Sequence, residues 1–193
     1  MRKTTIGVIG NASRPGTALP AGVLEAAEEI GRETARRGAV LVNGGTSGVM
    51  EASSRGAQAE GGLTVGFLPY HDFESGNAHL DLVFPTGMGT MRNIITARVC
   101  DSIIMIGGGV GTLNELTVAY DTGTPVVILA GSGGWSDRIR DVLIEGVWLD
   151  ERRVVPLTFA DSAADAVEQA LVRGRTEPRA DGRLRAFTGA GGQ

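Results

Sequence analysis

The chain has 193 residues, enough for one α/β domain with a well-formed core. Hydrophobic residues make up 42% of it and charged residues 21%, as in soluble globular proteins, and no apolar segment approaches the roughly 18–20 residues that span a bilayer. The net charge of −4 offers no basic surface for duplex nucleic acid or an anionic membrane, so neither is expected as a partner.

Short apolar runs alternate with helix-period segments along the chain. Seven runs predict strands, at residues 5–10, 39–43, 63–69, 81–84, 102–106, 124–130 and 153–159. Helices are predicted at 21–37, 47–60, 87–100, from the glycine loop at 107 to Tyr120, from about 136, and at 162–174. The polar stretch 70–80 is predicted to be a loop over the ligand face.

This order of elements predicts the fold class. Strands rich in Val, Ile and Leu that are separated by helices indicate a parallel sheet covered on both faces, a doubly wound Rossmann-like α/β fold. We expect residues 1–173 to form a single nucleotide-binding domain and the Gly- and Arg-rich residues 174–193 to form a flexible tail. In such sheets ligands bind beyond the carboxyl ends of the strands.

Three glycine-bearing turns follow predicted strands: GNASRPG (10–16), NGGTSGVME (43–51) and GGGVGTLNE (107–115). None contains a P-loop or a properly placed GxGxxG, so nucleoside triphosphate hydrolysis and NAD chemistry lose their strongest sequence support. Glycine lets backbone N–H groups approach an anion, and a helix N-terminus favours negative charge. The last two turns therefore predict a phosphate and ribose cradle made by Gly44, Gly45, Thr46, Gly108, Gly109, Gly111 and Thr112. The alternative is that these glycines serve only turn geometry and packing.

Glu115 has two interpretations. Thr112 and Glu115 match the spacing of a capping box, in which the glutamate bonds back to the N-cap N–H, and spacing alone favours that interpretation. A carboxylate at this position also lies at the mouth of the expected cleft. Arg92 stands near the start of its predicted helix, where a cation opposes the helix dipole, which indicates a carboxylate or phosphate partner.

Other reactive residues give little support for chemistry. His71 and His79 share one polar loop without a cysteine pair or a Glu-rich helix nearby, so no metal site is predicted. Ser13 and Ser47 lack a Ser-His-Asp context. Cys100 has no partner for an internal disulfide and is predicted to be a buried small hydrophobe. The amino terminus predicts a first strand rather than a signal peptide, and a cytoplasmic location is expected.

Two stretches, GGTSGVMEASSRGAQAEGGLTVGFLP and MRNIITARVCDSIIMIGGGVGTLNEL, resemble the superfamily of LONELY GUY (LOG) proteins and molybdenum-cofactor carriers. The likeness covers about residues 5–130 and rests on the paired patterns GGxxGV/LM and GGxGTxxE. LOG enzymes are Rossmann-like homodimers that hydrolyse the N-glycosidic bond of N6-substituted adenosine 5′-monophosphates. Carried over by position, the resemblance puts their catalytic pair at Arg92 and Glu115. LOG enzymes have Arg-Lys where this chain has Arg92-Asn93, and a proline where it has Gly107. In these positions the sequence is closer to the carrier-like branch.

The resemblance implies a dimeric protein that binds a nucleoside 5′-monophosphate and has phosphoribohydrolase activity, with Arg92 and Glu115 as the chemical pair. No metal or cofactor is required on this interpretation; an AMP-like nucleotide is the expected ligand. The alternative is a non-catalytic carrier or sensor of molybdenum cofactor or another phosphorylated pterin or nucleotide. The dimer interface is expected to include helix 87–100. Lysine decarboxylase chemistry is set aside, because no lysine beyond Lys3 exists to form a Schiff base.

Overall fold

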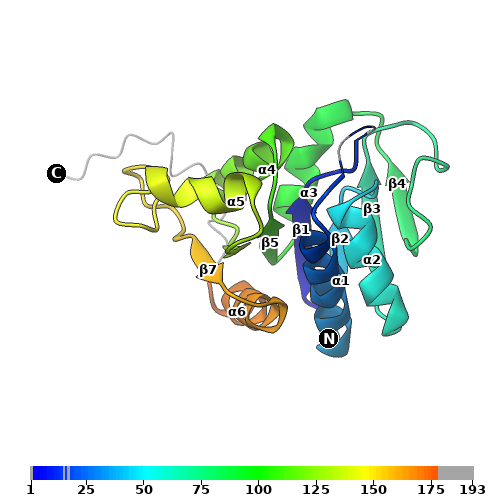
Figure 1. The fold of residues 1–193 in the computed structure, drawn as a ribbon, viewed down its shortest axis with the longest axis horizontal. Coiled ribbons are helices and arrows are strands. Elements are labelled where there is room, and N and C mark those ends of the chain that lie inside the picture. Colours follow the sequence, from blue (N-terminus) through cyan, green and yellow to red (C-terminus); the bar gives the residue numbers. More distant parts are fainter. Residues whose placement is uncertain (1, 15, 17, 178–193) are drawn as a thin grey trace.

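The computed structural model describes residues 2–14, 16 and 18–177. Its centre is a seven-stranded sheet with the order β4-β3-β2-β1-β5-β6-β7, in which every neighbouring pair is parallel (Figure 1). The strands are β1 (Thr5–Gly10), β2 (Val40–Asn43), β3 (Thr64–Leu68), β4 (Leu82–Pro85), β5 (Ser102–Ile106), β6 (Val126–Leu129) and β7 (Thr158–Ala160). The predicted doubly wound, Rossmann-like α/β fold is confirmed.

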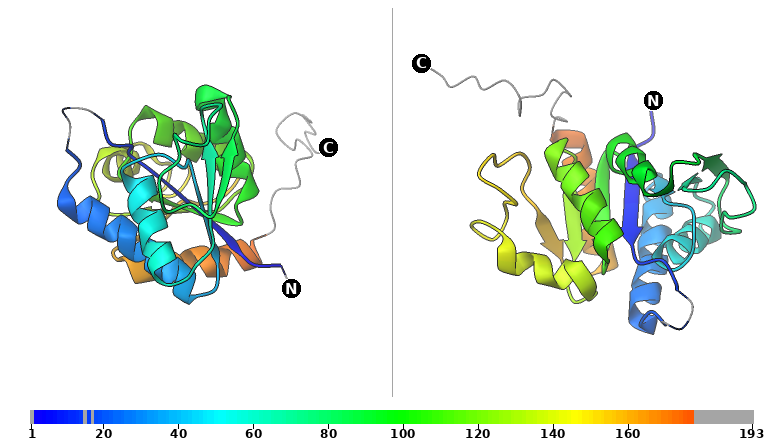
Figure 2. Two further views of the ribbon diagram at one scale, coloured as in Figure 1. Left: turned by 90° about the vertical axis from the view of Figure 1, so that its right-hand side faces the viewer. Right: turned by 90° about the horizontal axis from the view of Figure 1, so that it is seen from above.

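Helices cover both faces of this sheet (Figures 1 and 2). They are α1 (Ala21–Arg36), α2 (Val49–Ala59), α3 (Asn93–Val99), α4 (Val110–Asp121), α5 (Gly134–Arg138) and α6 (Ala163–Thr176), with 3-10 turns η1 (Gly89–Arg92) and η2 (Ile139–Val142). One apolar cluster joins α1, α2 and α6 to the sheet, and a second joins α3, α4 and η2 to the opposite face. Strand side chains such as Ile104 and Ile103 alternate between the two clusters, as a pleated strand requires.

The direction in which strands are added to the sheet reverses at β1. From β1 the sheet grows one way through β2, β3 and β4, and the chain then returns to add β5 on the other side of β1. Gly10 and Ile106, the last residues of β1 and β5, are register partners, so the loops that follow them leave the sheet side by side. This is the switch point at which open α/β sheets form a ligand crevice.

Two predicted elements differ from the observed ones. The predicted helix 87–100 begins later and in two parts, η1 and then α3, because Gly87 and Gly89 take positive φ values of 64° and 55°. The predicted strand 153–159 is confined to Thr158–Ala160. The cause is local: Arg153 has a φ of 50°, and Pro156 has no N–H to donate to a ladder. These shifts leave the order of the elements unchanged.

The end of the described chain is helical. Helix α6 ends at Thr176, and its N-cap Ser162 accepts a hydrogen bond from the Asp165 N–H. Of the predicted flexible tail, 174–193, residues 174–176 belong to α6 and Glu177 is its C-cap, so the prediction is wrong there. Residues 178–193 lie outside the described part of the chain. Within the described residues, no helix combines the length and the apolar character needed to cross a membrane.

Candidate functional site

A cavity of about 610 Å³ lies at the switch point, beyond the carboxyl end of β1. Its walls come from the loop after β1, the turn before α2, η1 with the start of α3, the first turns of α4, and residues 69–75. The volume falls within the range of roughly 300–1,000 Å³ that small-molecule sites occupy. Tyr70 and Ser75 belong to the predicted 70–80 loop, and both line the cavity.

Arg92 and Glu115 meet in this cavity although they are far apart in the sequence. Arg92 Nη1 donates to Glu115 Oε1 over 3.0 Å and to Thr96 Oγ1 over 3.4 Å. Arg92 is 9% exposed and Glu115 6% exposed, so this ion pair is almost fully desolvated. Arg92 Nε is buried without a hydrogen-bond partner in the described structure. A buried donor of this kind is an expensive feature for a purely structural residue.

Burial controls the protonation of the glutamate. Loss of solvent raises the pKa of Glu115 to about 7, although the positive charge and the hydrogen bond of Arg92 act in the opposite direction. Near neutral pH the side chain therefore exists both as a carboxylate and as a carboxylic acid. A group in this state can accept or donate a proton at the working pH of a cell.

The start of helix α4 excludes a capping box formed by Thr112 and Glu115. Helix α4 begins at Val110, and its N-cap Gly109 makes no side-chain cap. Thr112 and Glu115 therefore occupy the third and sixth helical positions, and no hydrogen bond from a backbone N–H to Glu115 is found among the described residues. The capping-box prediction is wrong, because the glycine turn starts the helix three residues earlier than a Thr112 N-cap requires. The carboxylate turns to Arg92 instead.

The absence of a side chain at Gly44 leaves room for the Arg92 guanidinium. A Cβ atom on Gly44 would lie 2.2 Å from Arg92 Nη2 and 2.5 Å from its Cζ, so the guanidinium packs directly against this backbone. The turn that contains Gly44 is held by Asn43, which is completely buried. Its Oδ1 accepts from the Gly45 N–H, and its Nδ2 donates to the Met50 carbonyl. Asn77, from the 70–80 loop, also holds this turn, because its Nδ2 donates to the carbonyls of Gly45 and Thr46.

Two helix N-termini point into the cavity. In α4 the first intrahelical bond runs from the Leu113 N–H to the Gly109 carbonyl, so the N–H groups of the first turn have no acceptor within the helix. The first turn of α2 lies beside it, held by a hydrogen bond from the Val49 N–H to the Asn11 carbonyl. Aligned helix dipoles and free N–H groups favour a bound anion at this end of the cavity.

Asn11 connects these turns. Its side-chain Oδ1 accepts from the Gly108 N–H, while its backbone carbonyl accepts from Val49. Gly48 has a φ of 70° and packs so closely that a Cβ would lie 2.4 Å from the Asn11 carbonyl oxygen. Since Oδ1 is occupied, the Asn11 amide nitrogen is left for the cavity that the residue lines. Arg14, further along the same loop, is exposed and also lines the cavity.

The structure places the predicted site residues in two groups. Six of them line the cavity: Thr46, Arg92, Gly109, Gly111, Thr112 and Glu115. Gly44, Gly45 and Gly108 lie behind it, where Gly44 contacts Arg92, Gly45 packs on Leu68, and Gly108 packs on Thr112. Asn11, Arg14 and Asn93 also line the cavity, although the sequence did not predict them as site residues. For Asn11 a signal existed, because a polar residue directly follows the glycine that ends β1.

The two histidines and the cysteine make contacts outside the Arg92–Glu115 pair. His79 Nδ1 bonds to Gln58 Oε1, and the His71 ring occupies the space a Cβ on Gly87 would need. Among the described residues, no three His, Cys, Asp or Glu side chains gather as a metal site. Cys100 is fully buried, as predicted for a small hydrophobe, and its thiol donates to the Thr96 carbonyl.

Comparison with known proteins gives a consistent set of relatives. The model of the SLOG cluster4 family matches residues 3–164. The cytokinin riboside 5′-monophosphate phosphoribohydrolase of Mycobacterium tuberculosis is 31% identical over 158 residues, which cover 75% of this chain and 83% of that protein.

Two solved structures share the fold at similar identity. The molybdenum cofactor binding protein of Rippkaea orientalis is 30% identical with a TM-score of 0.76, covering 89% of this chain and 98% of that one. The molybdenum cofactor carrier protein of Chlamydomonas reinhardtii is 30% identical with a TM-score of 0.70, covering 89% and 99%.

Proposed function

Because the chain belongs to the SLOG cluster4 family of LOG-like proteins, we propose that it binds a nucleoside 5′-monophosphate and hydrolyses the N-glycosidic bond. One observation carries the proposal: a desolvated Arg92–Glu115 pair lies in a cavity beside two helix N-termini. The helix ends suit a phosphate, and the pair suits bond cleavage a short distance away. The similarity to the mycobacterial phosphoribohydrolase supports the same activity.

The phosphate end of the ligand would lie against the first turns of α2 and α4. Backbone N–H groups there, with the Asn11 amide nitrogen, supply donors for phosphate oxygens. The charged residues that line the cavity are Arg14, Arg92 and Glu115. Two cations and one carboxyl group give this cavity a net positive charge, which attracts an anionic ligand.

The cleavage step would take place at Glu115. The bond between C1′ of the ribose and the base nitrogen breaks, its electron pair leaves with the base, and water oxygen bonds to C1′. The Glu115 carboxylate takes a proton from that water, and a proton is returned to the base, so the products are free base and ribose 5-phosphate. A pKa near 7 makes both transfers accessible at neutral pH.

Arg92 would act by holding this carboxylate in place. Its Nη1 fixes Oε1, which leaves Glu115 Oε2 for water or for the positive charge that develops on the ribose. Arg92 Nε is fully buried and has no partner in the described structure, so its unpaired N–H is a cost of seating the guanidinium beside Glu115.

The test is base release from a panel of nucleoside 5′-monophosphates that includes N6-substituted AMP, with the products separated by chromatography. We expect the wild-type chain to release base and Glu115→Gln to release almost none. The control is Glu28→Gln, the same chemical change on the far surface of α1, which should release base as the wild type does. Binding of a monophosphate without release would overturn the hydrolase proposal.

The second candidate is a carrier of molybdenum cofactor or another phosphorylated pterin. It is favoured by the two solved molybdenum-cofactor proteins, which align with almost nine tenths of this chain. The observed donors fit the phosphate of such a cargo as well as that of a nucleotide, because both present the same anion to the helix ends. Stoichiometric binding of the pterin, with no base released from any monophosphate, would favour this candidate.

We also propose a homodimer that uses the segment 87–100. Several apolar side chains of this segment are exposed, namely Met88, Met91, Ile94 and Val99. Met88 and Met91 belong to η1 and the residue before it, and Ile94 and Val99 belong to α3. Exposed apolar residues concentrated in one short segment are typical of an interface. Light scattering coupled to size exclusion should give twice the chain mass, and Met91→Glu should reduce it to one chain. A strictly monomeric wild type would contradict this proposal.

A further inference from the structure

The Asn93 side chain has two ends in different surroundings. Its amide nitrogen donates to the Gly111 carbonyl over 3.3 Å and to Asn114 Oδ1 over 3.0 Å. A backbone carbonyl only accepts hydrogen bonds, so the contact with Gly111 fixes which end of the amide is the nitrogen. Its oxygen, Oδ1, has no hydrogen-bond partner among the described residues, yet it is absent from the fully buried unpaired atoms. Asn93 is 5% exposed and lines the cavity, so this oxygen faces the cavity.

The position of Asn93 along α4 indicates which part of a ligand it meets. One anchor, Gly111, lies in the first turn among the free N–H groups of α4, and the other, Asn114, directly precedes Glu115. A nucleotide whose phosphate lies at the first turn and whose C1′ lies at Glu115 must place its ribose along this stretch. The ribose hydroxyls are then the groups nearest to Asn93.

The chemistry of the two partners agrees with this placement. A carbonyl oxygen can only accept, and it repels a phosphate oxygen, which is also an acceptor. A ribose hydroxyl is a donor, so it completes the free end of Asn93. An acceptor left unpaired in a ligand-filled cavity is costly, which means that a ligand without the hydroxyl is penalised.

We propose that Asn93 is a specificity-determining residue whose Oδ1 accepts a hydrogen bond from a ribose hydroxyl of the bound monophosphate. The inference rests on the proposed function for the orientation of the ligand. Its consequence is selection of ribonucleotides over deoxyribonucleotides, through a side chain that is itself held by the first turns of α4. Asn114 belongs to the support of Asn93 and does not line the cavity.

The experiment measures dissociation constants by calorimetry for three probes: AMP, 2′-deoxy-AMP and 3′-deoxy-AMP. For the wild type we expect at least one deoxy probe to bind about tenfold more weakly than AMP, the size of one hydrogen bond. Asn93→Ala should bind AMP and that probe within about twofold of each other, on the same basis. Asn114→Ala removes one anchor of Asn93 and leaves Oδ1 in place, so it should keep the preference for AMP.

The outcomes separate this inference from the proposed function. Equal affinity of the wild type for all three probes, or no binding of any, overturns the inference without the need of a variant. A preference that survives in Asn93→Ala overturns it as well, as does a preference lost equally in Asn114→Ala, since that result shows a structural role. A preference that disappears only in Asn93→Ala supports the inference, even if no base is released and the hydrolase proposal fails.

Discussion

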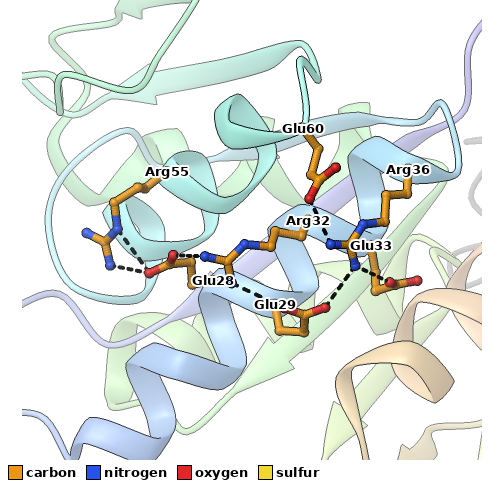
Figure 3. Close-up of polar contacts among 7 residues, drawn as sticks. All are labelled: Glu28, Glu29, Arg32, Glu33, Arg36, Arg55 and Glu60. Atoms are coloured by element: carbon orange, nitrogen blue, oxygen red, sulfur yellow. Dashed lines mark hydrogen bonds and ion pairs between the residues drawn. The ribbon is translucent and has the colours of Figure 1, made fainter.

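Two groups of arginines and glutamates differ in almost every physical respect. On the outer surface of α1 and α2, three arginines form a network of ion pairs with four glutamates (Figure 3). The members are Arg32, Arg36, Arg55, Glu28, Glu29, Glu33 and Glu60. In the cavity, Arg92 and Glu115 form one isolated pair. The surface side chains are 17% to 44% exposed, whereas those of the buried pair are 11% and 8% exposed.

The two groups differ in how their surroundings shift the pKa of a glutamate. On the surface, arginine neighbours hold the pKa of Glu28 below its usual value, so this carboxylate stays charged. In the cavity, burial outweighs one arginine neighbour and the pKa of Glu115 rises. A network of exposed pairs tolerates the loss of one member, but a buried pair leaves an uncompensated charge when one partner is removed.

The largest expected effect is on activity. Glu115→Gln keeps the shape of the side chain but cannot take a proton, so base release should fall by about 10²- to 10⁴-fold. The substitution keeps an acceptor for Arg92, so affinity for the monophosphate should change much less than kcat. Steady-state kinetics with separate kcat and KM values would check this. A fall confined to KM would show that Glu115 only binds.

The next effect is on the pH dependence of stability. Glu115 has a raised pKa, so between pH 4.5 and about 7 the folded chain keeps a proton that the unfolded chain releases. The free energy of unfolding should therefore fall as the pH rises through this window. One pKa unit corresponds to about 1.4 kcal/mol, which gives on the order of 3 kcal/mol for this residue.

Denaturant unfolding of the wild type and of Glu115→Gln across that pH range would check this. Gln does not titrate, and the other carboxylates are common to both chains and cancel in the difference. The wild type should lose stability relative to the variant as the pH rises. A difference in unfolding free energy that stays constant between pH 4.5 and 7 would show that burial does not raise this pKa.

A smaller effect is expected at the glycine that seats the arginine. Gly44→Ala would place a Cβ atom against the Arg92 guanidinium, so the side chain must move away from Glu115. We expect about 1–3 kcal/mol of destabilisation, as for other overpacked sites, and a loss of activity of at least about tenfold. Gly22→Ala is the control, because a Cβ there meets no atom within 4 Å. Normal activity in Gly44→Ala would mean that the position of Arg92 is unimportant.

The smallest effect belongs to the surface network. Glu28→Gln weakens its ion pairs with Arg32 and Arg55, but these side chains remain in contact with solvent. Thermal or denaturant unfolding should show a loss below about 1 kcal/mol, and the difference should shrink further in high salt. A loss of several kcal/mol would show that the network, and not the cavity, contains the critical charge pair.

The sequence predicted the order of the elements because apolar runs and helical periods are local signals. It also predicted that Arg92 needs a partner, since a cation at a helix start is unfavourable. Spacing alone favoured a capping box for Glu115, and that interpretation was wrong because capping and cavity-facing positions differ by only a few residues at the helix start. Here Gly109 begins α4 before Thr112, and spacing alone does not reveal which residue is the N-cap.

The residues that were missed share another cause. Asn93 follows Arg92 directly, but its importance depends on contact with Gly111 and Asn114, about 20 residues away. Asn11 joins two turns through Val49 and Gly108, which lie 38 and 97 residues further along the chain. Such long-range contacts have no periodicity in the sequence and become visible only when the sheet brings the loops together.

The most direct measurement compares one substitution at two places. Base release from AMP and from N6-substituted AMP should be followed for the wild type, Glu115→Gln and Glu28→Gln under identical conditions, after unfolding curves show that all three are folded. We expect Glu28→Gln to match the wild type and Glu115→Gln to lose at least about 10²-fold in kcat/KM. Equal activity of the two variants would contradict the claim that the buried pair performs the chemistry.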